Sequence, residues 1–145
     1  MKVSIQEIPG LEEEEVIIKC REMNEDIMAV LGKLKSAEKQ LTGLREDEIH
    51  KVALRDVYYF ETVDSKSFFY CKESMYESKL KLYEFEELAT SGGFFRASKS
   101  VVLNAMKISH IKPSLSGRFE AVLENNERIL VSRQYVPDLK RQLGI

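Results

Sequence analysis

The sequence is poor in the residues that crosslink a fold or bind metals. Its 145 residues include two cysteines, two histidines and no tryptophan. Cys20 and Cys71 form no Cys-x-x-Cys pair, and neither His50 nor His110 completes a set with metal-ligand spacing. We therefore expect reduced, structural thiols, no metal site, and a fold that depends on its apolar core.

Long apolar runs and enzyme motifs are missing as well. No stretch approaches the length of a membrane span, and the first ten residues lack the apolar centre of a signal peptide. No Gly-rich phosphate loop, nucleophile elbow or paired-carboxylate motif occurs. These absences predict a cytoplasmic protein without membrane insertion, enzymatic activity or cofactor.

The net charge of −2 hides an uneven distribution of charge along the chain. Residues 1–40 carry six basic and nine acidic side chains, residues 41–90 carry seven and eleven, and residues 91–145 carry nine and four. Only the last third is positive, at +5. An acidic protein with a basic final third can present a local positive surface to an anion.

The length suits one domain, or one domain with a small appendage. Residues 2–8 and 14–20 are predicted strands, and Asn24 is predicted to cap a helix. The apolar face of that helix recurs at helical spacing, at Ile27, Val30, Leu31 and Leu34. Residues 1–40 are thus expected to form a small β-β-α extension.

From Gln40 onward, β-branched and aromatic residues predict short strands between turn residues. The first long one has a kink near Arg55-Asp56, and a helix is expected between a Ser78 cap and Gly92-Gly93. The predicted strands are 52–63, 67–71, 73–79, 94–98, 108–112, 117–124 and 128–132, and a helix closes the chain at 136–143. This pattern indicates a mainly β, α+β fold with short helices.

Three similar tripeptides lie at predicted strand ends, namely Ser65-Lys66-Ser67, Ser98-Lys99-Ser100 and Ser132-Arg133-Gln134. Each places a hydroxyl beside a long cation. Ser and Lys are common surface residues, so one such tripeptide is more often a solvated loop than a site. The basic final third keeps a functional role open beside the solvated-loop interpretation, because cations bind phosphate and side-chain forks or amides read base edges.

The second tripeptide has a specific expected geometry. Ser98 is predicted to cap a helix and Lys99 to lie in its first turn, where free backbone N–H groups attract an anion. Arg96, two residues earlier on an extended segment, is expected to point to the same side.

Three longer blocks contain these tripeptides, and together they resemble the LytTR family of bacterial DNA-binding domains. The blocks are "DVYYFETVDSKSFFY", "FFRASKSVVLNAMKI" and "SGRFEAVLENNERILVSRQYVPDLK", in the family's order. The resemblance covers about residues 41–145 and implies an elongated stack of mostly antiparallel sheets. It also implies regulation of transcription by loops that enter successive major grooves of duplex DNA. From the tripeptides, the extended segment before Ser98 and this resemblance together, the expected DNA-binding positions are Lys66, Ser67, Arg96, Ser98, Lys99, Ser100, Arg133 and Gln134.

This sequence departs from the family pattern at Ser98, where His is usual, and at Gln134, where Arg is frequent. Residues 1–40 are too short for the phosphorylatable receiver domain of many relatives, so we expect a stand-alone regulator. The extension is expected either to cover part of the 41–145 domain or to mediate a homodimer. An alternative function is a non-enzymatic protein-interaction module that uses the acidic region 1–90.

Overall fold

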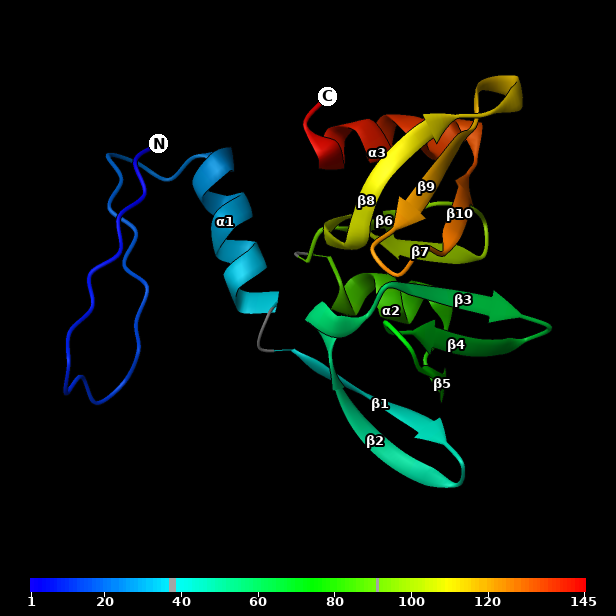
Figure 1. The fold of residues 1–145 in the computed structure, drawn as a ribbon, viewed down its shortest axis with the longest axis horizontal. Coiled ribbons are helices and arrows are strands. Elements are labelled where there is room, and N and C mark those ends of the chain that lie inside the picture. Colours follow the sequence, from blue (N-terminus) through cyan, green and yellow to red (C-terminus); the bar gives the residue numbers. More distant parts are fainter. Residues whose placement is uncertain (37–38, 91) are drawn as a thin grey trace.

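The computed structural model describes residues 1–36, 39–90 and 92–145. Its strands form two antiparallel sheets, a large one in the order β2-β1-β5-β4-β3-β7-β6 and a small one in the order β10-β9-β8 (Figure 1). The elements are α1 (Glu25–Ser36), β1 (Gln40–Arg45), β2 (Glu48–Ala53), η1 (Leu54–Asp56), β3 (Tyr59–Val63), β4 (Lys66–Tyr70), β5 (Met75–Ser78), α2 (Leu82–Leu88), β6 (Phe94–Arg96), β7 (Val101–Asn104), η2 (Ala105–Lys107), β8 (Ile108–Pro113), η3 (Leu115–Gly117), β9 (Phe119–Leu123), β10 (Arg128–Val131), η4 (Arg133–Tyr135) and α3 (Val136–Leu143).

The middle of the large sheet is buried on both faces. Alternation along β3 sends Tyr59 to one face and Phe60 to the other, and β7 divides Leu103 and Val102 in the same way. One face packs on α2, where the Phe60 and Phe85 rings stack with centroids 4.3 Å apart. The other face packs on the small sheet and α3, through residues that include Leu123, Val131 and Leu139. The domain therefore has two cores that share one sheet.

The predicted fold class, mainly β with short helices, is confirmed. The predicted kink at Arg55-Asp56 is the η1 turn that separates β2 from β3. Asn104 ends β7 and caps η2, since its Oδ1 accepts a 3.0 Å hydrogen bond from the Met106 N–H. The closing helix begins at Val136 with Pro137 in its first turn, where no N–H is needed.

The predicted Ser78 cap is wrong. Ser78 is the buried last residue of β5, and its Oγ accepts a hydrogen bond from the Leu80 N–H. The helix begins later, with Lys81 as its N-cap, and Glu84 Oε1 accepts a 3.0 Å bond from the Lys81 N–H. A strand partner for Ser78 therefore outweighs its preference for helix ends.

The first hairpin of the domain was not predicted. Its β1 strand alternates buried Leu41 and Gly43 with exposed neighbours, and its turn is Glu46-Asp47, both at positive φ. Glu-Asp is a weaker signal for such a turn than Asn-Gly or Asp-Gly. Glycine is required at position 43 because neighbouring side chains leave no room for a larger residue. An added Cβ would lie 2.5 Å from the Tyr76 Cβ and 2.6 Å from Phe69 Cζ.

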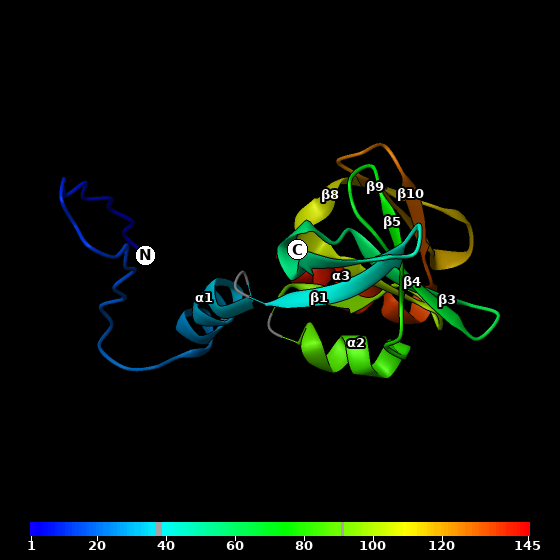
Figure 2. The ribbon, with the colours of Figure 1, turned by 90° about the horizontal axis from the view of Figure 1, so that it is seen from below.

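The predicted strands at 2–8 and 14–20 do not form, whereas the helix after Asn24 does. Asn24 Oδ1 accepts a 2.9 Å hydrogen bond from the Ile27 N–H, as expected of a cap. Figures 1 and 2 show residues 1–24 as an open loop on the far side of α1 from the sheets. Two isolated strands are marginal in water without a further layer to cover them, so β propensity alone does not form them. No helix in the described ranges is long and apolar enough to cross a membrane.

Candidate nucleic-acid interface

The first tripeptide lies at the tip of the β3–β4 hairpin. Val63 pairs with Lys66 across a two-residue turn, in which Asp64 and Ser65 have φ values of 49° and 64°. This geometry places Lys66 in solvent at the tip. Ser67 is 8% exposed and lies inside the sheet, with its Oγ 3.5 Å from Thr62 Oγ1. The structure therefore exposes Lys66 to solvent and places Ser67 in the sheet interior.

The second tripeptide is a tight connection between β6 and β7, and the predicted helix after Ser98 is absent. The Ala97 N–H donates to the Val101 carbonyl at 2.9 Å, and the Ser100 N–H donates to Ser98 Oγ at 3.3 Å. The next residues form β7, because Val101, Val102 and Leu103 are all buried in the sheet. The expected anion site at a helix N-terminus is therefore wrong, although Lys99 remains exposed.

The third tripeptide follows β10. Ser132 precedes the single turn η4, in which Arg133 and Gln134 are exposed and Tyr135 is half-buried. The Tyr135 N–H donates to the Ser132 carbonyl at 2.9 Å, which keeps the turn compact. Residues 133–135, between the predicted strand at 128–132 and the predicted helix at 136–143, thus form a short 3-10 helix.

Backbone hydrogen bonds join the three tripeptides side by side. The Thr62 N–H donates to the Ser100 carbonyl at 2.9 Å, which joins the β3–β4 hairpin to the β6–β7 connection. The Ser132 N–H donates to the Ala97 carbonyl at 2.8 Å, which joins that connection to the end of β10. We call residues 64–67, 97–100 and 132–134 the three-loop edge. The hairpin tip and the β6–β7 connection lie on the right-hand side of the molecule in Figure 1.

The three-loop edge presents positive charge to solvent. Lys66, Lys99 and Arg133 are exposed, and no ion pair within the described residues engages any of them. Gln134 adds an exposed amide, which can donate and accept at once. Ser98 and Ser100 are half-buried and contribute to the shape of the loop. Such an edge can hold phosphate with its cations and read base edges with its polar side chains.

Arg96 does not point freely to this edge as expected. One guanidinium nitrogen donates to Glu86 Oε1 of α2 at 2.7 Å, and the other donates to the Lys99 carbonyl at 2.9 Å. The Nε atom is buried and has no hydrogen-bond partner among the described residues. The side chain is only 26% exposed. Arg96 therefore fixes the 97–100 loop to α2, and its charge is already paired.

One feature of this edge was missed from the sequence, namely the support of Arg133 by the β8–β9 connection. Gly117 has a φ of 74°, and an added Cβ would lie 2.9 Å from Arg133 Cδ and 3.1 Å from Arg133 Cγ. The aliphatic stem of Arg133 thus packs on the bare backbone of Gly117. The Ser-Gly pair at 116–117 was a signal for a tight turn, but the residue it would contact lies far along the chain.

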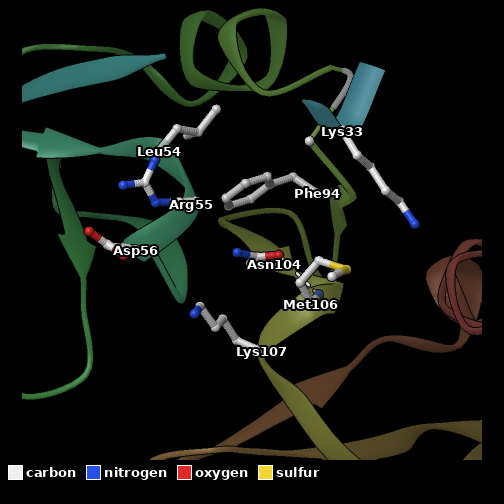
Figure 3. A pocket seen from close by; sticks show the side chains of 9 residues that line it. Lys33, Leu54, Arg55, Asp56, Phe94, Asn104, Met106 and Lys107 are labelled. Atoms are coloured by element: carbon white, nitrogen blue, oxygen red, sulfur yellow. Dashed lines mark hydrogen bonds between the residues drawn. The ribbon is translucent and has the colours of Figure 1, made fainter. Parts of the chain in front are cut away.

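A separate hollow of about 300 Å³ lies where α1 approaches the domain (Figure 3). Asn104 lies in its wall with both polar groups in use, since Nδ2 donates to the Val57 carbonyl at 2.8 Å and Oδ1 accepts from Met106. Within the described residues, no group of three His, Cys, Asp or Glu side chains could hold a metal ion.

Comparison with protein families gives one match that spans most of the domain. The model of the LytTr DNA-binding domain matches residues 47–144. A solved structure, the LytTr DNA-binding domain of a Bacillus cereus protein named as a putative methyl-accepting/DNA response regulator, is 29% identical. It superposes with a TM-score of 0.69 and covers 74% of this chain and 99% of that one.

Two curated relatives match this chain over different lengths. The sensory transduction protein LytT of Enterococcus faecalis is 28% identical over 100 residues, which are 69% of this chain and 41% of that protein. The chain thus spans less than half of that relative. A Staphylococcus aureus protein, named as an uncharacterized HTH-type transcriptional regulator, is 25% identical over 130 residues, 88% of each chain. That alignment is longer than the 47–144 domain, so it includes residues outside it.

Proposed function

Because this chain belongs to the LytTR family of DNA-binding regulators, we propose that it regulates transcription by binding a specific duplex sequence with its three-loop edge. The observation that supports this proposal is the convergence of three tripeptides, far apart in sequence, through the Thr62–Ser100 and Ser132–Ala97 hydrogen bonds. The proposal assigns no catalytic step and no cofactor to the protein.

The exposed side chains of the edge have distinct proposed roles. Lys99 and Gln134 read base edges, since a lysine suits the acceptors of guanine and an amide suits adenine. Lys66 enters the neighbouring groove from the hairpin tip, and Arg133 holds phosphate or a guanine. Ser98 and Ser100 shape the loop beside them. Loops from separate connections reach successive major grooves when duplex DNA lies along the edge.

A gel-shift titration tests the proposal with the promoter DNA of the protein's own operon against random duplex of the same length. The wild type should prefer the promoter at moderate salt. Lys99→Ala should weaken promoter binding by about 1–3 kcal/mol and relax the preference at one base pair. Lys51→Ala, an exposed lysine on β2 at the opposite end of the large sheet, is the matched control and should bind normally. Equal affinity of the wild type for both duplexes would reject the proposal.

A second function, protein interaction, is supported by a different part of the chain. Large apolar side chains are exposed throughout residues 1–36, including Val3, Ile5, Val16 and Met28. Contiguous exposed apolar surface typically marks an interaction site. We propose that the extension binds a protein while the three-loop edge binds DNA.

A further inference from the structure

The exposed apolar surface of this chain is concentrated in its first quarter. Of the twenty large apolar side chains that are exposed in the described residues, eleven lie between Met1 and Leu34. Val3 is 82% exposed and Ile5 is 89% exposed. Scattered exposed apolar residues are normal, but such a concentration in one segment indicates a surface that another molecule covers.

Helix α1 is the helical part of this surface. It has 12 residues, and an isolated helix of that length is marginal in water even with a good cap. Its apolar residues recur at 27, 30, 31 and 34 and form one stripe, yet Val30 is 36% exposed and Leu34 is 40% exposed. The helix therefore needs a partner for its stripe.

The DNA-binding domain is not that partner. Both hydrophobic core clusters, as far as the structure describes the chain, begin at Leu41 or later. Where α1 comes near the domain, Lys33 lies in the lining of the 300 Å³ hollow (Figure 3). Within the described residues, neither core takes in the apolar stripe of α1.

The charged residues of α1 favour an antiparallel second copy of the same helix as its partner. The first turn carries Glu25 and Asp26, and the last turn carries Lys33 and Lys35. When a second copy of the helix lies antiparallel, each acidic end faces a basic end, whereas parallel copies would face like charges. Asp26 and Lys33 are seven residues apart, so they lie on the same flank of the stripe. Around a two-fold axis, Asp26 is then opposite the partner's Lys33.

We infer that α1 is a homodimer interface, in which the apolar stripes of two chains pack antiparallel around a two-fold axis. Stable interfaces bury about 800 Å² on each partner. Twelve helical residues extend only about 18 Å. The apolar side chains of residues 1–24, on the outer side of α1, supply the remaining area. This inference goes beyond DNA binding and holds in the absence of DNA.

Sedimentation equilibrium of the full chain without DNA is the first test. We expect a mass near twice the 16.7 kDa of one chain. Replacing Val30→Ser together with Leu34→Ser removes exposed apolar surface, leaves both cores intact, and should raise the dimer dissociation constant at least about tenfold. Ile49→Ser, an equally apolar change that is 78% exposed on β2, should leave the constant unchanged.

Reciprocal charge reversal tests the antiparallel arrangement. Variant A carries Glu25→Lys and Asp26→Lys, and variant B carries Lys33→Glu and Lys35→Glu. In a homodimer of variant A, or of variant B, like charges face each other at both ends of the helix pair. The dimer dissociation constant of each variant should therefore rise on the order of tenfold or more. An equimolar mixture of A and B pairs opposite charges again and should form the heterodimer. Circular dichroism confirms that α1 persists in each variant.

Three results would overturn the inference. The first is a monomeric mass for the wild type at high micromolar concentration. The second is a dimer that the Val30→Ser and Leu34→Ser changes leave unaffected. The third is an A and B mixture that stays monomeric while the wild type dimerises. None of these results depends on DNA binding, so failure of the dimer and failure of the proposed DNA-binding mode are distinguishable.

Discussion

Arg96 shows how the role of one side chain depends on the partners that surround it. It lies two residues before an exposed loop lysine and carries the charge expected of a phosphate contact. Its guanidinium is instead held by Glu86 and by the Lys99 carbonyl. We regard it as a positioning residue, which acts on DNA binding through the 97–100 loop.

Glu86→Gln separates positioning from phosphate contact. This change removes a negative charge, so a protein in which Arg96 binds phosphate should hold DNA as well or better. If Arg96 positions the loop, its weaker bond to the neutral amide should loosen the loop and weaken promoter binding by about 1 kcal/mol. Gel shifts measure the affinity, and amide chemical shifts of residues 97–100 should move with it. Unchanged shifts with tighter DNA binding would contradict the positioning role.

The two cysteines should differ in reactivity. Burial raises the pKa of the Cys71 thiol to about 11, with a further contribution from the Asp56 charge that outweighs the opposing effect of Lys107. Cys20 is exposed. Because thiolate is the nucleophile, only about one Cys71 in a thousand is reactive at pH 8.

Iodoacetamide at pH 8 should therefore alkylate Cys20 first, with Cys71 slower by at least about 100-fold until urea unfolds the chain. Mass spectrometry of the wild type and of Cys20→Ser measures both rates. Equal rates in the folded protein would show that the Cys71 thiol is not shielded as the structure indicates.

At the scale of elements, the β8–β9 connection and η4 form one unit although 16 positions separate Gly117 from Arg133. The glycine backbone supports the stem of the arginine, and the arginine head lies at the three-loop edge. A change in one connection should therefore alter binding at another.

Gly117→Ala tests this coupling. The added methyl would overlap Arg133 Cδ and displace it, so promoter affinity should fall by about 1–2 kcal/mol as a well-placed cation is lost. Gly144→Ala is the matched control, because Gly144 has the same φ of 74° but nothing within 4 Å of the added Cβ. Both variants should lose about 1 kcal/mol of unfolding free energy through backbone strain. Equal DNA affinity of the two variants would contradict the coupling.

At the scale of the whole molecule, a chain of net charge −2 presents three exposed cations, Lys66, Lys99 and Arg133, on one edge. The two cores on either side of the large sheet hold that edge rigid, since each tripeptide begins or ends at a strand of a buried layer. The negative net charge of the whole chain repels DNA, but the exposed cations of the three-loop edge can still attract it locally.

Promoter binding should weaken as salt increases. Arg133 is the cation of the edge that is proposed to hold phosphate, and each phosphate neutralised contributes roughly −0.9 to the slope of log K against log [salt]. Fluorescence anisotropy between low and moderate salt measures this slope, and Arg133→Ala should reduce it by about 1. A slope near zero would exclude the edge as an electrostatic contact.

Whether the structure of a segment was predicted correctly depends on how near in the sequence the residues that determine it lie. The kink at Arg55-Asp56, the Asn24 cap and the start of α3 near Pro137 depend on residues within one or two turns, and all three were predicted correctly. The order of the sequence blocks was sufficient to predict the LytTR fold.

Other predictions failed where a distant partner decides the local structure. Ser78 and Ser98 both have the chemistry of helix caps, but strand pairing and burial of their neighbours place them in β5 and before β7. Residues 2–8 and 14–20 have strand propensity, but no second layer covers them within one chain, as far as the described residues extend.

The amino-acid sequence by itself determined the β-rich fold, the three hydroxyl–cation tripeptides and the basic final third, because these depend on composition and short spacing. Only the tertiary structure decided that Thr62 bonds to Ser100, that Ser132 bonds to Ala97 and that Arg96 is bound to Glu86. Those contacts join residues far apart in the chain, and packing of two sheets through a shared core is what brings them together.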